Sequence, residues 1–380
     1  MKILFVSMNA IHTSRWIGNL VDSGHELYWF DVLGKGSFDT NVEMYQIIDW
    51  KKRKIPYFKG EHFLRKKMPR FYEKIEPFIQ VTANEKIEQL LKEIKPDLVH
   101  SFEMHSCSYP ILKTMQKNPK MKWLYSCWGS DIYKYQEIPY YLPNIKKILA
   151  RIDYLHTDCL RDYKLAMKLG FDGTHMEIIP GGGGFKLELF QKHFTPFEER
   201  KIILVKGYQH HVGRGLQIIK ALEQLPHLYF KYKIVVFGAH SKVQNYIQNQ
   251  KLPFKVYGRH ALSHEEILSL MGKSVLYIGN SISDGMPNTL LEAVVMGAFP
   301  IQSNPGNVTS EILLDRKNGL LIYNPDSISE IKALIEFSIN NPNLLQKAFQ
   351  YNQQNLKSKL EYNFIQQKIV DLYNKIELEL

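Results

Sequence analysis

The chain is 380 residues long, is 44% hydrophobic and 23% charged, and carries 49 Lys and Arg against 38 Asp and Glu, a net charge of +11. This length favours two domains over one, and the globular composition argues against disorder. No apolar run reaches the roughly 18 residues that span a bilayer, and the start of the chain fits a buried strand better than a signal peptide. Three cysteines without a CxxC pair argue against a disulfide framework or a structural zinc site, so we expect a cytoplasmic protein.

Short apolar runs alternate with longer amphipathic stretches in the first half of the chain. This alternation is typical of a parallel sheet whose two faces are covered by helices. A helix is expected from about residue 14 to residue 22, followed by Gly24. The predicted strands span residues 3–7, 26–32, 96–101, 122–128, 153–157 and 175–180.

The same alternation restarts after the glycine run 181–184 and Pro196, which indicates a second α/β domain. The sequence therefore predicts an α/β fold with two Rossmann-like domains, residues 1–190 and 191–358, and a C-terminal helix within residues 359–380. Because parallel strands end at a common edge, ligands are expected in a cleft shared by the two sheets. The predicted strands of the second domain span residues 201–207, 232–238, 254–258, 275–280, 298–303 and 319–323.

A basic stretch from Lys51 to Lys74 contains ten Lys and Arg against two Glu, with aromatic residues between them. Basic residues mixed with aromatics suit an anionic membrane surface, at about 1 kcal/mol per basic residue near the lipid. A nucleic acid backbone is an alternative partner, and a solvated basic face is equally compatible with the pattern.

The loop DGMPN, residues 284–288, lies between a predicted strand and a predicted helix at 289–296. Asn288 is a candidate N-cap, and the backbone N–H groups of the first turn would form an anion site that suits a phosphate. Glu292 is a lone carboxylate in an apolar helix, so it needs a partner. Asp284 and Glu292 could bind the hydroxyl groups of a sugar or a ribose, although a capped turn with two carboxylates is also ordinary structure.

The segment DGMPNTLLEAVVMGAFPI, residues 284–301, resembles the Glu-x7-Glu region of the family 4 retaining glycosyltransferases of GT-B fold. The resemblance implies two Rossmann-like domains with parallel sheets facing across a cleft, and a C-terminal helix, from about residue 362 to residue 377, that crosses back to the first domain. Other segments that are similar to this family follow in order along the chain: HTSRW (12–16), PDLVHSFE (96–103), WGSDIY (128–133), IIPGG (178–182), VKGYQHHVGRG (205–215) and YGRHALSHEEI (257–267).

The resemblance implies roles for the residues of the second domain. Glu292 would bind the ribose of a nucleoside diphosphate-sugar, and Asp284 would contact the donor sugar, where the family usually has Glu. Lys206 and Arg214 would lie beside the diphosphate; Arg214 is the better supported, because the spacing to Lys206 is longer than usual. The chain has no DxD triplet, so no metal is expected. The remaining donor-binding candidates, whose backbone would face the sugar and diphosphate, are Gly285, Met286, Asn288 and Thr289.

Candidates in the first domain lie at the ends of predicted strands. His100 and Glu103 are catalytic candidates, because the family often has a histidine near the reacting sugar; a structural histidine is the alternative for His100. Asp131 could bind acceptor or donor hydroxyls, or could cap a helix. The remaining candidates for the acceptor or sugar cleft are His12, Thr13 and His105.

Together these patterns predict a metal-independent, retaining glycosyltransferase that uses a nucleoside diphosphate-sugar and no other cofactor. The acceptor is expected to be a saccharide or lipid-linked saccharide, as in bacterial surface polysaccharide assembly. The stretch Lys51–Lys74 would then dock the enzyme on the inner face of the membrane, with no nucleic acid partner. The alternatives are an epimerase-like isomerase of sugar nucleotides, and a basic nucleic-acid or membrane-binding protein with a decayed sugar site.

Overall fold

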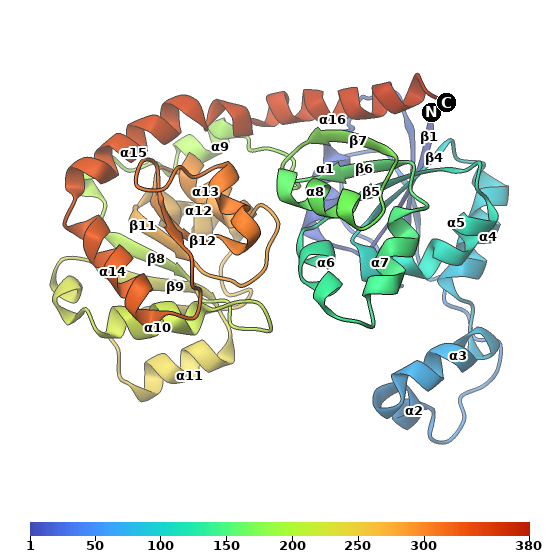
Figure 1. Ribbon diagram of the computed structural model, residues 1–380, viewed down its shortest axis with the longest axis horizontal. Coiled ribbons are helices and arrows are strands. Elements are labelled where there is room, and N and C mark those ends of the chain that lie inside the picture. The colour runs from blue at the N-terminus through green and yellow to red at the C-terminus, as the bar shows by residue number, and fades with distance from the viewer. The chain divides into compact units, whose positions relative to one another are not determined.

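The computed structural model describes residues 1–380 (Figure 1), apart from the side chain of Arg70, so this one member of the basic stretch lies outside the described side chains. The chain forms two compact units. The main part of the first unit ends at Ile179, whereas the sequence predicted residue 190 as the boundary. The first unit also includes the end of the chain from Lys368, whereas the predicted C-terminal segment began at residue 359. The first unit comprises Met1–Thr157, Asp162–Ile179 and Lys368–Leu380, and the second comprises Asp158–Arg161 and Pro180–Gln367.

The first unit is built on a seven-stranded sheet with the order β3-β2-β1-β4-β5-β6-β7, in which every pair of neighbours is parallel. The strand order reverses between β1 and β4, where Phe5 lies beside His100. All residues of the central strand β4 are buried, as expected for a sheet covered on both faces. The strands are β1 (Lys2–Ser7), β2 (Glu26–Asp31), β3 (Tyr45–Ile47), β4 (Leu98–Phe102), β5 (Lys122–Ser126), β6 (Tyr154–Thr157) and β7 (Thr174–Ile178).

The helices of the first unit differ from the sequence expectation mainly before β4. The first helix begins at Ile11, three residues earlier than expected, and the basic stretch forms two helices, α2 and α3, that stand out from the body of the unit (Figure 1). The bounds are α1 (Ile11–Gly18), α2 (Glu61–Lys67), α3 (Pro69–Ile79), α4 (Ala83–Ile94), α5 (Leu112–Lys117), α6 (Ser130–Tyr133), α7 (Leu142–Leu149) and α8 (Leu160–Lys168).

The second unit has a six-stranded parallel sheet with the order β10-β9-β8-β11-β12-β13, whose order reverses between β8 and β11. The strands are β8 (Ile202–Lys206), β9 (Lys233–Ala239), β10 (Lys255–Gly258), β11 (Ser274–Gly279), β12 (Phe299–Ser303) and β13 (Leu320–Ile322). The helices are α9 (Leu187–Gln191), α10 (Gly215–Glu223), α11 (Ser241–Asn249), α12 (His264–Gly272), α13 (Asn288–Val295), α14 (Ile328–Ile339) and α15 (Pro342–Asn355).

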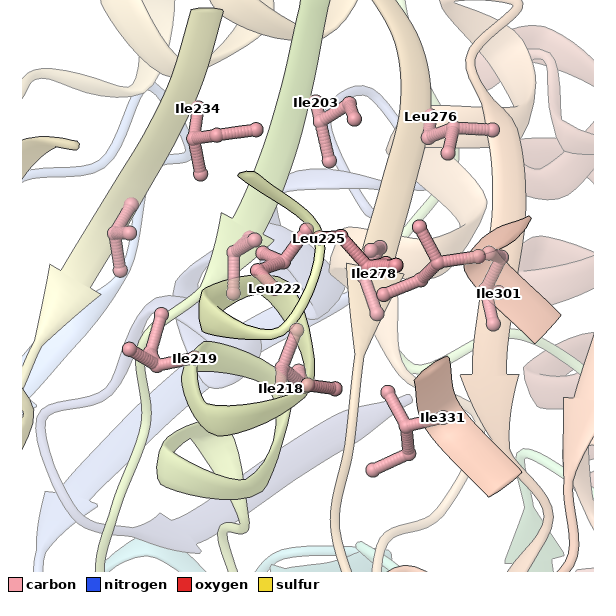
Figure 2. Close-up of a cluster of buried hydrophobic side chains, with 14 of the residues drawn as sticks. Ile203, Ile218, Ile219, Leu222, Leu225, Ile234, Leu276, Ile278, Ile301 and Ile331 are labelled. Atoms are coloured by element: carbon pink, nitrogen blue, oxygen red, sulfur yellow. The ribbon is translucent and has the colours of Figure 1, made fainter. Parts of the chain in front are cut away.

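The core of the second unit forms where α10 packs on this sheet. Leu222 of α10 and Leu225 beyond its end lie against Ile203 and Ile278 of the two central strands (Figure 2), and all four side chains are fully buried. Both sheets are parallel and covered by helices, so the predicted α/β fold with two Rossmann-like domains is confirmed. That the two sheets face a shared cleft stays a prediction. No described helix is long and apolar enough to cross a membrane.

The last helix, α16 (Tyr362–Glu377), has the predicted bounds, and its residues from Lys368 onward belong to the first unit. Tyr373 fixes it there, because its fully buried hydroxyl accepts a hydrogen bond from Trp16 Nε1 at 2.9 Å and lies 2.6 Å from His100 Nδ1. Burial raises the pKa of Tyr373, so this hydroxyl stays protonated. The return of the C-terminal helix to the first domain is therefore confirmed.

Removing this hydroxyl should destabilise the first unit. Tyr373→Phe keeps the ring but leaves the buried Trp16 N–H without its acceptor, which costs about 1–3 kcal/mol. Urea unfolding should show this loss in Tyr373→Phe and none in Tyr45→Phe, since Tyr45 is exposed. Equal stability of the two variants would contradict the role given to Tyr373.

Candidate functional site

The loops that follow β8 and β11 meet at the carboxyl edge of the second sheet. Gly213 forms an antiparallel bridge with Ser281, and the N–H of Arg214 donates to the carbonyl of Asn280 at 2.9 Å. Ligands of open parallel sheets bind where the strand order reverses, outside the carboxyl ends of the strands. The loop 284–288 lies in the connection from β11 to α13, so the candidate donor site lies at this reversal point.

Glu292 has the partner that its burial requires. The carboxylate is 3% exposed and accepts a hydrogen bond from His264 Nε2 at 2.7 Å. His264 is the first residue of α12, which Ser263 and Glu266 begin with a capping box. The sequence did not reveal this pair, because 28 residues separate its members; the only signal was that His264 lies in the segment YGRHALSHEEI.

The start of α13 differs from the expectation. Pro287 occupies the N-cap position, and Asn288 is the first helical residue rather than the cap. Thr289 accepts a hydrogen bond at Oγ1 from the hydroxyl of Tyr277 at 3.0 Å, which ties α13 to β11. The predicted cap by Asn288 is therefore wrong, and the anion site at this turn stays a prediction.

The loop 284–288 is held by residues 158–161, which comprise the link after β6 and the first two residues of α8. The N–H of Met286 donates to Asp158 Oδ2 at 3.0 Å, and Arg161 donates to the carbonyl oxygen of Asp284 at 2.7 Å. A Cβ atom on Gly285 would lie 2.6 Å from the Asp158 carboxylate, so any side chain at this position would have to displace that carboxylate. The Met286 amide that the sequence assigned to the donor is thus occupied by a protein carboxylate.

The two predicted cations differ in their surroundings. Arg214, at the N-cap of α10, forms an ion pair with Asp326 at 2.8 Å. Lys206, the last residue of β8, has its Nζ 4.7 Å from the ring centroid of Tyr208, and no ion pair of Lys206 occurs within the described part of the chain. The sequence favoured Arg214 as the cation beside the diphosphate. Because Arg214 already pairs with Asp326, the structure favours Lys206 for this role.

Four further residues gather around Lys206 and were missed from the sequence. They follow three adjacent strands: Tyr208 and His210 come after β8, His240 after β9 and Arg259 after β10. The signal that could have found them is their position just beyond predicted strand ends. We call these four residues and Lys206 the Tyr208 cluster.

In the first unit, Glu103 directly follows β4 and has a left-handed backbone, with φ of 56°. Its carboxylate accepts hydrogen bonds from the N–H groups of His105 at 3.0 Å and Ser106 at 2.6 Å. Such backbone conformations are rare in residues other than glycine and concentrate at functional sites. Glu103 and His105 thus lie together at the carboxyl edge of the sheet, as predicted from their positions.

Asp131 lies inside the fold rather than at a ligand surface. Its buried carboxylate accepts hydrogen bonds from the N–H groups of Met104 and Trp128, both at 3.1 Å, and from the hydroxyl of Tyr125. Burial, reinforced by Glu103, raises the pKa of Asp131 to about 7. Its carboxylate oxygens are already engaged by these protein donors, so binding of substrate hydroxyls by Asp131 stays a prediction. Gly129, not Asp131, occupies the N-cap position of α6.

His100 and Thr13 are also internal. His100 is fully buried, with Nδ1 near the Tyr373 hydroxyl and Nε2 2.8 Å from Ser126 Oγ, and burial lowers its pKa far below the usual value. Thr13 is fully buried on α1. Neither can touch a substrate in this arrangement, which corrects their assignment. His12 is half-buried, with its ring 5.5 Å from that of Trp128.

Comparison with known proteins bears on both units. A family model described as glycosyl transferases group 1 matches residues 186–355, and one described as glycosyl transferase 4-like matches residues 2–159. One relative, from Campylobacter jejuni, is 23% identical over 269 residues, 68% of this chain and 69% of its own. It is the GalNAc-alpha-(1->4)-GalNAc-alpha-(1->3)-diNAcBac-PP-undecaprenol alpha-1,4-N-acetyl-D-galactosaminyltransferase.

Solved structures share the whole architecture. Sucrose-phosphate synthase from Thermosynechococcus elongatus covers 100% of both chains, with a TM-score of 0.71 and 14% identity. Anabaena HepE in complex with UDP and glucose covers 98% of this chain and 99% of its own, with a TM-score of 0.66 and 15% identity. These similarities show the GT-B fold.

The contact between Gly285 and Asp158 can be tested by crowding it. Gly285→Ala should lower the free energy of unfolding by about 1–3 kcal/mol, because the added methyl group overlaps the carboxylate. Gly181→Ala is the matched control, since a Cβ there meets nothing within 4 Å. In an Asp158→Ala background the cost of Gly285→Ala should shrink; an unchanged cost in urea unfolding would show that the two residues do not interact.

Proposed function

We propose that this chain, which belongs to the group 1, family 4-like glycosyltransferases of GT-B fold, moves a sugar from a nucleoside diphosphate donor to a hydroxyl of a saccharide or lipid-linked saccharide. The observation that carries this proposal is the buried Glu292 carboxylate, held by His264 at the reversal point of the second sheet. A carboxylate fixed there can accept hydrogen bonds from both hydroxyls of a ribose.

We further propose that transfer proceeds with retention of configuration and without a metal ion. Departure of the sugar leaves negative charge on the diphosphate, which fixed cations can stabilise in place of a metal. Lys206 and Arg259 offer such charge around Tyr208, beyond the carboxyl end of β8. Asp284 is the candidate contact to the donor sugar. The leaving diphosphate would itself accept the proton of the acceptor, so the protein contributes positioning and charge stabilisation rather than a nucleophile.

A lipid-linked acceptor is suggested by the relative from Campylobacter jejuni, whose name describes an undecaprenol-linked acceptor. We therefore propose a role in bacterial surface polysaccharide assembly. In the first unit, Glu103 and His105 are the polar groups best placed for the acceptor side, because they lie at the carboxyl edge of the sheet.

The α2–α3 hairpin is suited to hold such an enzyme on an anionic membrane. Glu61 accepts two hydrogen bonds from the Arg53 guanidinium, both at 2.8 Å, and one from Tyr72, and this fixes the hairpin from within. Several large side chains remain outside: Phe63 is 60% and Phe78 75% exposed. Exposed aromatics beside basic residues favour insertion at the lipid interface. We propose a peripheral position on the cytoplasmic face of the membrane. The other exposed apolar residues here are Ile55, Tyr57, Phe58, Met68 and Phe71.

Nucleotide binding tests the donor site. Thermal unfolding with UDP, GDP, ADP, CMP and dTDP, without added metal, should show one nucleotide that stabilises the wild type, by about 2.7 kcal/mol at 100 times its dissociation constant. Glu292→Ala should abolish this stabilisation. Glu336→Ala is the matched control, a carboxylate on α14, away from the loops at the reversal point. Stabilisation that survives in Glu292→Ala would contradict the site.

Product analysis separates transfer from the alternatives. Incubation of the corresponding sugar nucleotide with a lipid-linked saccharide should yield an extended saccharide with the anomeric configuration of the donor. A changed sugar nucleotide without an acceptor product would instead indicate the isomerase. Binding of polyanions that is unaffected by Glu292→Ala, with no nucleotide binding, would indicate the basic binding protein.

Membrane docking is tested by sedimentation with liposomes. The wild type should bind vesicles that contain anionic phospholipid and not neutral vesicles, and Phe63→Ser with Phe78→Ser should weaken binding at least tenfold. Phe230→Ser is the control, since Phe230 is 95% exposed on the second unit. The pair Lys66→Ala and Lys67→Ala should weaken binding more than Lys242→Ala with Lys347→Ala. No preference for anionic lipid would remove the docking role.

A further inference from the structure

The Tyr208 cluster is organised around one aromatic ring. Lys206 Nζ lies 4.7 Å and the Arg259 guanidinium carbon 5.8 Å from the centroid of the Tyr208 ring. The rings of His210 and His240 lie 6.0 Å and 5.5 Å from it, and 5.4 Å from each other. Three strand ends thus bring four nitrogen-bearing side chains to one place.

The backbone fixes the position of the Tyr208 ring. Gly238, near the end of β9, has a φ of 61°, and a Cβ atom there would lie 2.6 Å from Tyr208 Cε1. A residue with a side chain would therefore be strained and would push the ring away. The cluster depends on this glycine for its compactness.

Hydrogen bonds also fix which nitrogen of each histidine is available. His240 Nδ1 accepts the N–H of Gln209 at 3.2 Å, and His210 Nδ1 accepts the N–H of Val212 at 3.3 Å. Because Nδ1 is the acceptor in each ring, the hydrogen of the neutral ring resides on Nε2. The neutral ring of each histidine therefore has a hydrogen to donate from Nε2, and the ring of His240 also has a hydrogen bond to the backbone of Gly207, which opposes the lowering of its pKa by burial.

Acidic groups do not balance this cluster. Among the described residues, no ion pair joins Lys206, His210, His240 or Arg259 to a carboxylate. His210 is faced by His211 on its own loop and by His240, Lys206 and Arg259 from the adjacent strand ends; His240 is faced by Arg259. Burial, followed by these neighbours, lowers the pKa of His210 to about 4 and lowers that of His240. Both rings are therefore neutral near pH 7 while the site is empty.

We propose that the Tyr208 cluster binds the diphosphate of the donor and that His210 and His240 take up protons when it binds. Cations gathered without counterions are unfavourable unless an anion joins them, and a diphosphate supplies two negative charges. Bound beside the rings, those charges favour imidazolium, so each Nε2–H bond to phosphate becomes charge-assisted. This inference rests on the proposed donor site, and it adds that the affinity for the donor depends on pH.

The direction of the effect follows from linkage. Each proton taken up on binding makes the association constant rise about tenfold per unit of decreasing pH, between the pKa of the bound state and that of the free state. Donor affinity should therefore increase as the pH falls from 8 towards 5.5. The probe must not titrate itself, so esterified UDP-, GDP- and ADP-glucose are preferable to the free diphosphates, whose terminal phosphate titrates near pH 6, at about the second pKa of a phosphomonoester.

Calorimetry of the full chain tests the proposal with the tightest-binding of these three sugar nucleotides. Titrations at pH 6.5 in buffers of different ionisation enthalpy should show uptake of about one to two protons per ligand. The double variant His210→Gln and His240→Gln should bind about tenfold or more weakly at pH 6, with a flat pH profile. His227→Gln is the control, an exposed histidine outside the cluster that should leave the profile unchanged.

The outcomes separate this inference from the function on which it rests. One outcome is that binding requires Glu292 but neither releases nor takes up protons, and that the double variant has the same pH profile as the wild type. This outcome overturns the role of the two histidines and leaves the proposed donor site unaffected. A pH profile that persists in the double variant also overturns it, because the titrating group then lies elsewhere. Failure of the wild type to bind any of the three sugar nucleotides overturns both proposals.

Discussion

The reversal of strand order between β8 and β11 is the constraint on which the candidate donor site depends. A parallel sheet brings every strand to its carboxyl end at the same edge, and the reversal separates the helices that follow the two central strands. The loops after β8 and β11 occupy the space between them, and they are joined through Gly213 and Ser281. The loop after β8 carries Tyr208 and His210, two members of the Tyr208 cluster, and the loop after β11 leads to Glu292. Two chemically different halves thus meet because of topology rather than proximity in the sequence.

These halves match two adjacent parts of the proposed nucleoside diphosphate-sugar, its ribose and its diphosphate. A ribose offers hydroxyl donors, and the buried Glu292 carboxylate is an acceptor whose orientation His264 fixes. A diphosphate offers only acceptors and negative charge, and Lys206 and Arg259 have no acidic partner among the described residues. Arg214 matches the family pattern better, but its charge is already paired with that of Asp326. The chain therefore places its uncompensated charge around Tyr208, and this shifts the expected diphosphate contact towards β8 and β9.

Buried parallel strands were the most predictable part of the fold, because each is a short apolar run; most ends agree within two residues. The three-residue β3 and the helices of the basic stretch lack such a signal and were missed. Among the site residues, Glu103 follows β4 and lies at the sheet edge, as expected. His100 lies within the strand, two residues before its end, and it is buried because both faces of this strand are covered. The partner of Glu292 could not be predicted, because pairing of α12 with α13 is a tertiary event that neither segment encodes alone.

Two features of this protein oppose its own stability. Cations around Tyr208 repel one another, and Phe63 and Phe78 remain in water although the Arg53–Glu61 pair already holds their hairpin together. Neither feature adds much to packing within its unit, since Phe63 and Phe78 are mostly exposed and the cations have no counterion among the described residues. Each feature would become favourable only on binding of a complementary partner. The cations would be stabilised by a diphosphate, and the exposed aromatics by a lipid interface. The function proposed above supplies both: a nucleoside diphosphate-sugar as donor and a lipid-linked saccharide as acceptor.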